Sequence, residues 1–261
     1  MRSLSIAATG MLAQQLNVEV ISNNIANVNT TGFKRQRAEF NDLLYQNLRR
    51  AGTSSSDTGT IVPSGIQVGL GVKPAATYRI TEQGNLLITD NSLDLAINGK
   101  GYFVVELPSG DTAYTRAGAL GQSADGDLVT SNGFIIQPGI TLPQDALDVT
   151  INAQGEVLVS IDGQTAPTNV GQLQLANFPN EAGLQAVGDS LFLETPASGT
   201  ATVAAPGSSG FGTIQQGALE TSNVNIVSEI TNLITAQRAY EMNSRVIQAS
   251  DEMMSSVNQL R

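Results

Sequence analysis

Apolar residues recur every seven positions at both ends of this 261-residue chain. A strict seven-residue period is typical of a helix that packs along another helix, because it keeps these side chains on one line. The pattern therefore predicts a helix at each end, and the two helices are expected to pair as an antiparallel coiled coil. The predicted contact line consists of Leu4, Met11, Val18 and Ile25 in the first helix and Ile226, Leu233, Tyr240, Ile247 and Met254 in the last.

Each predicted helix also carries apolar residues on its opposite side. These residues are Ile6, Leu12, Leu16 and Val20 in the first helix and Met242, Val246, Met253 and Leu260 in the last. A helix that is apolar on two sides has to be buried on both, and one hairpin of two helices buries only one side of each. We therefore expect both ends to be loose in a single chain and to order against other copies. The alternative is an ordinary amphipathic helix that docks on its own domain.

Polar residues bound both predicted helices. Gly32 is expected to end the first helix, because glycine is the favoured residue just beyond a helix C-terminus. The last helix has several candidate N-cap residues and an acidic residue, Glu229, in its first turn. The candidate N-caps are Thr221, Ser222, Asn223 and Asn225.

The middle of the chain has the pattern of short strands and turns. Asn98-Gly99, Asp125-Gly126 and Asn132-Gly133 each stand between apolar runs and predict β-hairpins. The predicted fold class is α+β, with a mainly antiparallel β centre and an extended β-like arm. The expected domains are a helical domain of residues 1–32 and 222–261, a connecting region of 33–74 and 206–221, and an all-β domain of 75–205.

The segment from residue 49 to residue 74 is rich in glycine, serine and threonine. A disordered linker is one interpretation, but apolar residues alternate along its second half, as they do in a strand. We therefore expect an extended hairpin or arm. The residues that define it are Ile61, Pro63, Gly65, Val68 and Gly71.

Charge and residue types exclude several functions. The chain has a formal charge of -10 and only three lysines, which argues against binding to nucleic acid or to anionic membranes. The one basic cluster, residues 34–37, is interpreted as a solvated surface segment. The chain contains no cysteine and no histidine, so it has no thiolate, no zinc–thiolate site and no imidazole base. A hydrolase that uses two carboxylates stays open as an alternative, with Asp145 and Asp148 or Glu181 and Asp189 as candidate pairs.

Membrane insertion and cleavage of a signal peptide are not expected. The apolar runs are shorter than the roughly 18 residues that cross a bilayer. The N-terminal segment is interrupted by polar residues, and no convincing cleavage site follows it. No cofactor and no metal are predicted.

Four segments resemble bacterial flagellar rod and hook proteins. The N-terminal one is "SNNIANVNTTGFKRQRAEF", residues 22–40, whose motif turn contains Asn27, Asn29, Thr30, Gly32 and Phe33. Residues 93–105 and 114–138 resemble the central segments of that family, and residues 217–261 resemble its C-terminal signature. Within the family, the length and "GTIVPSGIQVGLGV" at 59–72 are most similar to distal rod subunits. A proximal rod or hook subunit is the nearest alternative, and a soluble β-rich binding module is the alternative of another class.

The resemblance implies a structural protein without catalytic residues. Such chains leave the cytoplasm through the flagellar export channel without a cleaved signal. They polymerise helically into a tube that crosses the periplasm and the outer membrane, encloses the export channel and transmits torque. The implied partners are other copies, proximal rod subunits, hook subunits and the proteins of the L and P rings. We further expect the arm to bridge adjacent subunits and to stiffen the tube.

Overall fold

The computed structural model describes residues 2–49, 64–161 and 166–259. Contacts divide the chain into two compact units. We call the first the helical unit; it comprises residues 1–25, 36–78 and 225–261. We call the second the β body; it comprises residues 26–35 and 79–224. The two helices and the antiparallel sheets confirm the expected α+β class.

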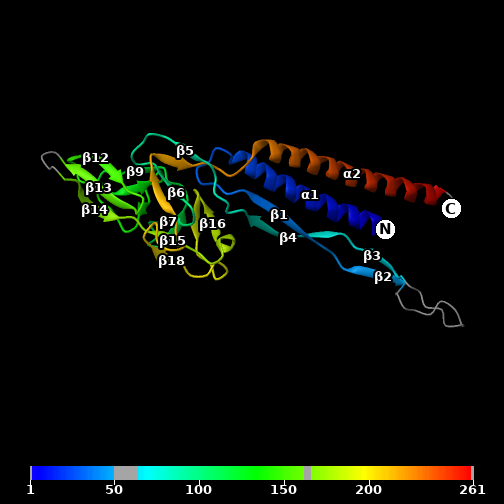
Figure 1. Ribbon diagram of the computed structural model, residues 1–261. Coiled ribbons are helices and arrows are strands. Elements are labelled where there is room, and N and C mark those ends of the chain that lie inside the picture. Colours follow the sequence, from blue (N-terminus) through cyan, green and yellow to red (C-terminus); the bar gives the residue numbers. More distant parts are fainter. Residues whose placement is uncertain (1, 50–63, 162–165, 260–261) are drawn as a thin grey trace. The chain divides into compact units, whose positions relative to one another are not determined.

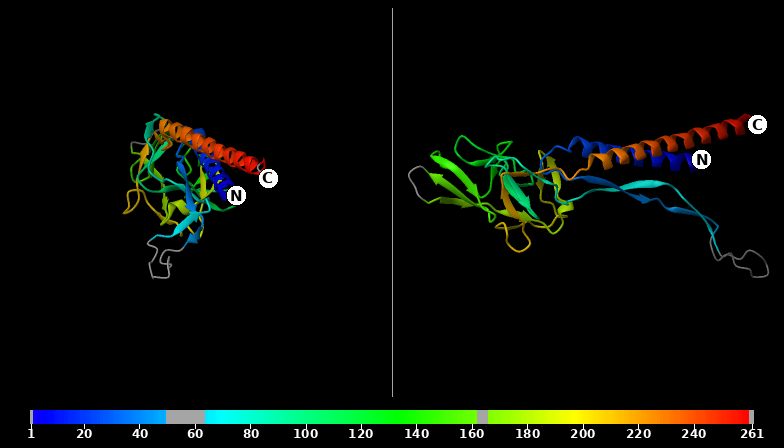
Figure 2. Two further views of the ribbon diagram at one scale, coloured as in Figure 1. Left: turned by 90° about the vertical axis from the view of Figure 1, so that its right-hand side faces the viewer. Right: turned by 45° about the horizontal axis from the view of Figure 1, so that its top comes forward.

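Two helices run side by side in opposite directions in the helical unit (Figures 1 and 2). They are α1, Arg2–Ala26, and α2, Ile226–Gln259. The predicted cap of the last helix is confirmed for Asn225, whose Oδ1 accepts a hydrogen bond from the Ser228 amide at 3.1 Å. The predicted end of the first helix is wrong. The helix ends at Ala26, six residues before Gly32, because residues 27–33 form a turn in which the Thr30 amide donates to the Asn27 carbonyl.

The remainder of the helical unit is a long two-stranded hairpin. Its outer pair is β1, Gln36–Asp42, with β4, Val72–Arg79, and its inner pair is β2, Tyr45–Arg49, with β3, Ile66–Gly69. The Leu43 amide donates to the Gly71 carbonyl at 2.9 Å and joins the two pairs. The described residues therefore form an extended β ribbon, and residues 50–63 lie outside the described part.

The largest sheet of the β body contains nine strands in the described residues. Its path runs β16–β17–β8–β7–β11–β10–β9, and β15 pairs with both β7 and β18. The bounds are β7 Tyr102–Glu106, β8 Thr112–Thr115, β9 Leu120–Gln122, β10 Leu128–Thr130, β11 Ile135–Ile136, β15 Leu175–Asn177, β16 Gln185–Gly188, β17 Leu191–Leu193 and β18 Thr202–Ala204.

Smaller sheets complete the body. A three-stranded meander orders β12–β13–β14, and two pairs join β19 to β6 and β20 to β5. Their bounds are β5 Leu86–Ile88, β6 Leu95–Asn98, β12 Ala146–Ile151, β13 Glu156–Ile161, β14 Thr168–Gln172, β19 Thr213–Gln216 and β20 Ala218–Glu220. A short 3-10 helix, η1, spans Glu181–Gly183.

Strand β7 lies between two hydrophobic cores. Side chains alternate along a strand, so Phe103 and Val105 enter the larger core while Tyr102 and Val104 enter the smaller one. The smaller core is aromatic: Tyr102 packs edge-on against Phe178, with ring centroids 6.0 Å apart. This burial on both faces explains why β7 is a continuous apolar run.

Two of the three predicted hairpins are confirmed. The turn at Gly126 connects β9 to β10, and the turn at Gly133 connects β10 to β11. The hairpin predicted at residues 98–99 is wrong, because β6 pairs with β19 rather than with β7. Residues 99–101 instead cross between sheets, and the carbonyl groups of Gly99 and Gly101 accept hydrogen bonds from the Arg116 guanidinium.

Candidate functional site

Direct contacts between α1 and α2 occur at polar and small residues. Near one end of the pair, the Ser3 and Ser250 hydroxyl oxygens share a hydrogen bond of 3.2 Å. Near the other end, Asn24 Nδ2 donates to Glu229 Oε2 at 3.1 Å. Between them Asn243 lies against Gly10, where an added Cβ would be 2.9 Å from Asn243 Nδ2.

The residues of the predicted contact line lie beside these contacts. All four in α1, and Leu233 and Ile247 in α2, are half-buried. Three in α2 are largely exposed: Ile226 at 46%, Tyr240 at 44% and Met254 at 40%. The structure therefore places the predicted line at the margin of the helix pair.

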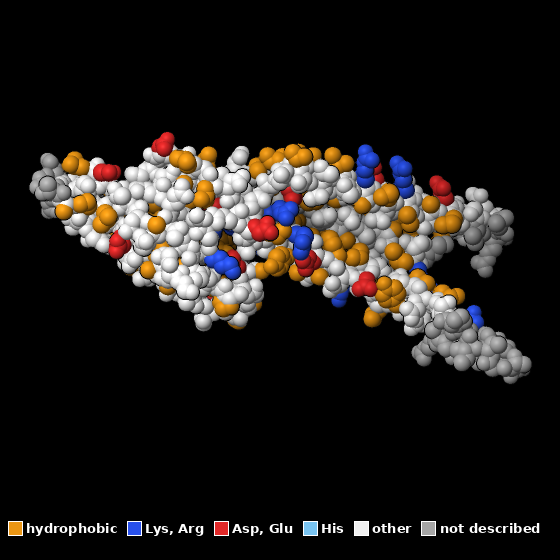
Figure 3. Space-filling view, viewed as in Figure 1, with side chains coloured by type: hydrophobic (Ala, Val, Ile, Leu, Met, Phe, Trp, Pro, Cys, Tyr) orange, Lys and Arg blue, Asp and Glu red, His pale blue; other side chains and the backbone are white. Residues whose placement is uncertain are grey.

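The residues predicted for the opposite faces divide between buried and exposed positions. In α1, Val20 is buried, Ile6 and Leu16 are half-buried, and Leu12 is exposed. In α2, the described members Met242, Val246 and Met253 are all exposed, whereas Leu260 lies outside the described residues. Further exposed apolar side chains gather over the first half of α2 (Figure 3), where Val227, Ile230 and Ile234 lie.

The motif turn of residues 27–33 leads into a buried ionic network in the β body. Gly32 is buried at φ +69°, and its amide donates to the Glu220 carbonyl at 2.8 Å. Phe33, Asn27 and Thr30 are half-buried, and Asn29 is exposed. Lys34 follows the turn directly. Together with Glu220 and Arg116 it forms the ionic network.

Every charge of this network is paired. Lys34 Nζ donates to Glu220 Oε1 at 2.6 Å and to the Glu82 carbonyl at 2.8 Å. Arg116 Nε donates to Glu220 Oε2 at 2.8 Å, and Gly84 donates its amide to Glu220 Oε1 at 2.9 Å. The interpretation of the basic cluster as a solvated segment is wrong for Lys34, whose residue is 3% exposed.

Burial and charge act in opposite directions on the network. Burial is the largest influence on Lys34; it lowers the pKa of Lys34, Arg116 lowers it further, and Glu220 raises it only in part. Burial alone would raise the pKa of Glu220, but Arg116 and Lys34 together outweigh it and hold that pKa below its usual value. Glu220 is therefore the charged centre that makes two buried cations tolerable.

Two asparagines hold the backbone of the segment that joins α1 to β1. Asn24, 1% exposed, accepts from the Gln36 amide at 2.9 Å and donates to the Gln36 carbonyl at 2.8 Å. In the β body, Asn223 accepts from the Arg35 amide at 2.7 Å and donates to the Ile80 carbonyl at 3.0 Å. Asparagines were predicted at the helix boundaries, but these two roles depend on partners that are distant in the sequence, so the local pattern gave no sign of them.

The described part of the arm contacts α1 at Thr9. Gly71 has φ +124°, and a Cβ at this position would collide with Thr9 Oγ1. Gly65 and Val68 are half-buried, with Val68 in β3, while Ile61 and Pro63 lie outside the described residues. The ribbon also exposes apolar side chains, namely Leu44, Tyr45, Leu48 and Ile66.

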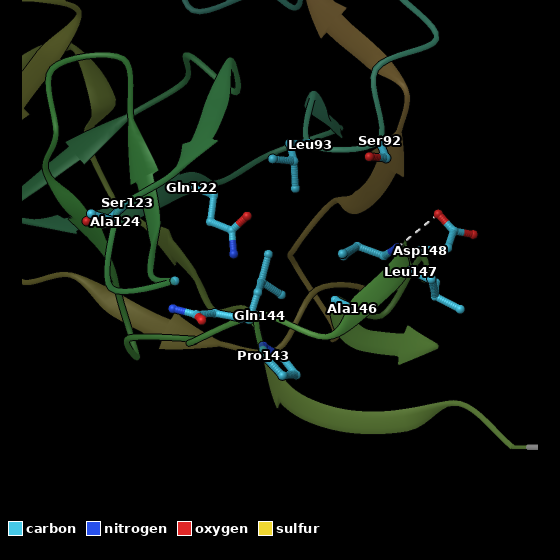
Figure 4. A pocket seen from close by; sticks show the side chains of 13 residues that line it. Ser92, Leu93, Gln122, Ser123, Ala124, Pro143, Gln144, Ala146, Leu147 and Asp148 are labelled. Atoms are coloured by element: carbon cyan, nitrogen blue, oxygen red, sulfur yellow. Dashed lines mark hydrogen bonds between the residues drawn. The ribbon is translucent and has the colours of Figure 1, made fainter. Parts of the chain in front are cut away.

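A polar hollow of about 420 Å³ opens in the β body (Figure 4). Its lining includes Gln122, Ser123, Gln144 and one charged residue, Asp148. The Asp148 carboxylate accepts a hydrogen bond from the next amide, Val149, at 2.9 Å. A single carboxylate that is occupied by its own backbone offers no acid–base pair for hydrolysis.

The described residues hold neither a metal site nor a membrane-spanning helix. They contain no group of three or more acidic side chains close enough to hold a metal ion. Neither of the two described helices combines the length and the hydropathy that crossing a bilayer needs.

Three family models match the chain. A model described as "Flagella basal body rod protein" matches residues 4–34, and one described as "Flagellar hook protein FlgE/F/G D1 domain" matches residues 96–159. A third, "Flagellar basal body rod FlgEFG protein C-terminal", matches residues 215–260. The matched segments include all of α2, most of α1 and most residues of the larger core.

Curated relatives match over the full length. The flagellar basal-body rod protein FlgG of Caulobacter vibrioides is 63% identical over 261 residues, which covers 100% of both chains. FlgG of Agrobacterium fabrum is 54% identical over 258 residues, covering 99% of this chain and 98% of the relative. FlgG of Bacillus subtilis is 37% identical over 266 residues, covering 100% of this chain and 99% of the relative.

Proposed function

This chain belongs to the family of flagellar basal-body rod proteins, and we propose that it forms the distal part of that rod. The family is structural rather than enzymatic. In the proposal, copies of the chain polymerise helically into a rigid tube that transmits torque from motor to hook and encloses the export channel. Full-length similarity to FlgG proteins supports the rod assignment, and the exposed apolar faces of α2 support polymerisation.

The exposed apolar surface of α2 is large enough to drive association. Its exposed apolar residues are Ile226, Val227, Ile230, Ile234, Tyr240, Met242, Val246, Met253 and Met254. A fully buried apolar side chain contributes about 1.5–3 kcal/mol to the free energy of association. Scaled by the exposed fraction of each of these side chains, their burial would contribute at most about 7–14 kcal/mol per copy. This gain is similar in size to the free-energy cost of the translational and rotational freedom that one copy loses on association, about 4–15 kcal/mol. A copy in a helical polymer loses that freedom once but touches several neighbours.

We propose that α1 and α2 form a coiled coil inside the tube and that neighbouring copies cover the outer faces of α2. The proposed further partners are proximal rod subunits, hook subunits and the L and P ring proteins. In this proposal the rod spans the periplasm and the outer membrane, and the chain is exported without a cleaved signal peptide. No nucleic acid and no membrane insertion enter the proposal.

The decisive experiment places a charge on the exposed face of α2. Met242 is 62% exposed, so Met242→Asp leaves the fold of the single chain intact but puts a carboxylate into the proposed interface. We expect Met242→Asp to abolish polymerisation in sedimentation and to leave circular dichroism unchanged. The matched variant Met242→Leu keeps an apolar side chain of similar volume and should polymerise normally. Normal polymers of Met242→Asp would refute the interface.

The predicted contact line gives a second test. Ile25→Asp and Ile247→Asp replace half-buried residues at the margin of the helix pair and should block assembly while the β body stays folded. Limited proteolysis of the dilute wild-type chain separates the proposal from a soluble binding module. An assembly subunit should lose both ends quickly and keep its centre, whereas a docked module should resist cleavage at the ends.

The arm is proposed to bridge adjacent subunits and to resist bending. The apolar side chains that the ribbon exposes, such as Leu44 at 84%, support contact with another copy. Deleting residues 53–65 should give polymers that electron microscopy shows to be curved. Straight and equally stiff polymers from the deletion variant would refute the bridging role.

A further inference from the structure

The contacts observed between α1 and α2 follow a seven-residue period of polar and small residues. In α1 the seven-residue period passes through Ser3, Gly10, Asn17 and Asn24, and in α2 it passes through Glu229, Ala236, Asn243 and Ser250. Four of these eight residues are almost completely buried: Asn24, Glu229, Ala236 and Ser250 are exposed by 3% or less. We call these eight residues the polar ladder.

The ladder has a single register. In each observed contact the two residue numbers add up to 253: Ser3 with Ser250, Gly10 with Asn243, and Asn24 with Glu229. Asn17 and Ala236 obey the same sum. The contacts extend from one end of α1 almost to the other, over about 32 Å of helix.

We propose that the polar ladder determines the register of the helix pair, whereas the apolar residues beside it supply affinity without specifying position. Leucine, isoleucine, valine and methionine are nearly equivalent at successive turns, so an apolar line tolerates a slip of seven residues. A buried polar residue does not, and a single buried asparagine is known to specify register in coiled coils. This inference concerns pairing within the helical unit and goes beyond the proposed rod function.

A slip by one period would break specific contacts. If α1 moved one period in either direction, Asn24 would lose Glu229, and its buried amide would miss a hydrogen bond. In one direction Gly10 would face Ala236 and leave a void; in the other, Asn24 would face Ala236. The contact of Asn24 with Gln36 adds a second restraint, because it ties the same amide to the first residue of β1.

Gly10 and Asn243 are the steric part of the ladder. Three atoms of the Asn243 amide lie 2.9–3.3 Å from the position of a Cβ on Gly10, so the amide rests directly on the α1 backbone. A side chain at position 10 would require the Asn243 amide to shift from its observed place. The only glycine of α1 therefore has a positional role that outweighs its unfavourable helix propensity.

Engineered cysteines measure the register, since the natural chain contains none. Ser3→Cys with Ser250→Cys reports the observed register, and Ser3→Cys with Val246→Cys reports a position one helical turn away. Disulfide formation requires Cα atoms within about 7 Å of each other. We expect the first pair to oxidise at least about tenfold faster than the second, in the dilute chain or in the sedimented polymer. Equal rates in both fractions would overturn the proposal.

Exchanging the two interlocking residues tests their role. In the Ser3→Cys/Ser250→Cys background, Gly10→Asn should slow oxidation several-fold, and adding Asn243→Gly should restore the rate to within about twofold. Ser5→Asn, at an exposed position of the same helix, is the matched control and should change nothing. Gly10→Asn without effect, or no recovery in the double variant, would refute the interlock. Oxidation is also measured in the dilute chain, so a chain that does not polymerise can still confirm the register. The register proposal and the rod proposal can therefore fail independently.

Discussion

Neutralising Glu220 should destabilise the β body more than any change of a surface charge. In Glu220→Gln the side chain keeps its length, but one of its two terminal atoms becomes an N–H donor. Both oxygens of the native carboxylate accept from cations, Lys34 at 2.6 Å and Arg116 at 2.8 Å. The amide must therefore turn a donor toward one buried cation, and both cations lose their counter-charge.

The structure sets the magnitude of this effect. The Glu220 and Lys34 side chains are 0% and 1% exposed, so water cannot replace the lost partner. Removing one member of a buried ion pair costs about 3–5 kcal/mol. For a unit the size of the β body, 1 kcal/mol shifts the melting temperature by about 2–4 °C, so we expect Tm to fall by about 6–20 °C.

Chemical and thermal denaturation of the full chain, followed by circular dichroism, measure this change. Glu106→Gln is the matched control, because Glu106 lies on an exposed position of β7 and should change stability by no more than about 0.5 kcal/mol. If Glu220→Gln and Glu106→Gln had the same effect, Glu220 would not be the centre of a buried network, and the reasoning would be wrong.

The same residue predicts a dependence on acid. Folding lowers the pKa of Glu220 below the ordinary value of 4.5, so the folded state favours the charged carboxylate. Its contribution to stability is complete above the unfolded-state pKa and disappears as the pH falls through the lower folded-state pKa. Acid unfolding should therefore begin below about pH 4.5 in the wild type, and Glu220→Gln should show a smaller loss over that range.

Three further changes test other contacts. Asn24→Leu leaves the Gln36 amide and carbonyl without their partner and should cost about 1–3 kcal/mol, seen as faster hydrogen exchange at Gln36. Gly71→Ala strains a backbone at φ +124° and pushes against Thr9, so trypsin should cleave faster at Arg49. Gly118→Ala drives a Cβ into the Leu95 carbonyl in the larger core and should lower Tm, whereas Gly121→Ala, which has open space, should lower it much less.

The seven-residue period predicted both helices because it is a local property of each segment. The position of their contact was harder to predict. Leu4 follows Ser3 and Met11 follows Gly10, so the apolar line lies only about 100° around α1 from the polar line. Hydropathy favours the apolar line as the place of contact. The polar line can be recognised as the contact only after the two helices are aligned, because only then does Gly10 face Asn243.

The turns divide in a similar way. Gly126 and Gly133 lie in hairpins whose two strands are neighbours in sequence, so local residue types sufficed to predict them. Asn98-Gly99 has the same composition, but β6 finds its partner in β19, more than a hundred residues later. The residues around Asn98-Gly99 carry no information about β19, which pairs with the edge of β6. The local residue types therefore predicted a hairpin that does not form.

Lys34 shows why the local sequence does not predict a buried charge. It also shows which segments must meet before the β body is fully stable. Its local surroundings are basic and polar, which favours exposure, and its buried state depends on Glu220, 186 residues away. Glu220 in turn binds Arg116 across 104 residues. Before Glu220 arrives, the site would hold two uncompensated cations, a state that costs several kcal/mol. The β body therefore cannot reach its full stability until Lys34, Arg116 and Glu220 have come together, so the ionic network forms only after all three of these segments have been synthesised.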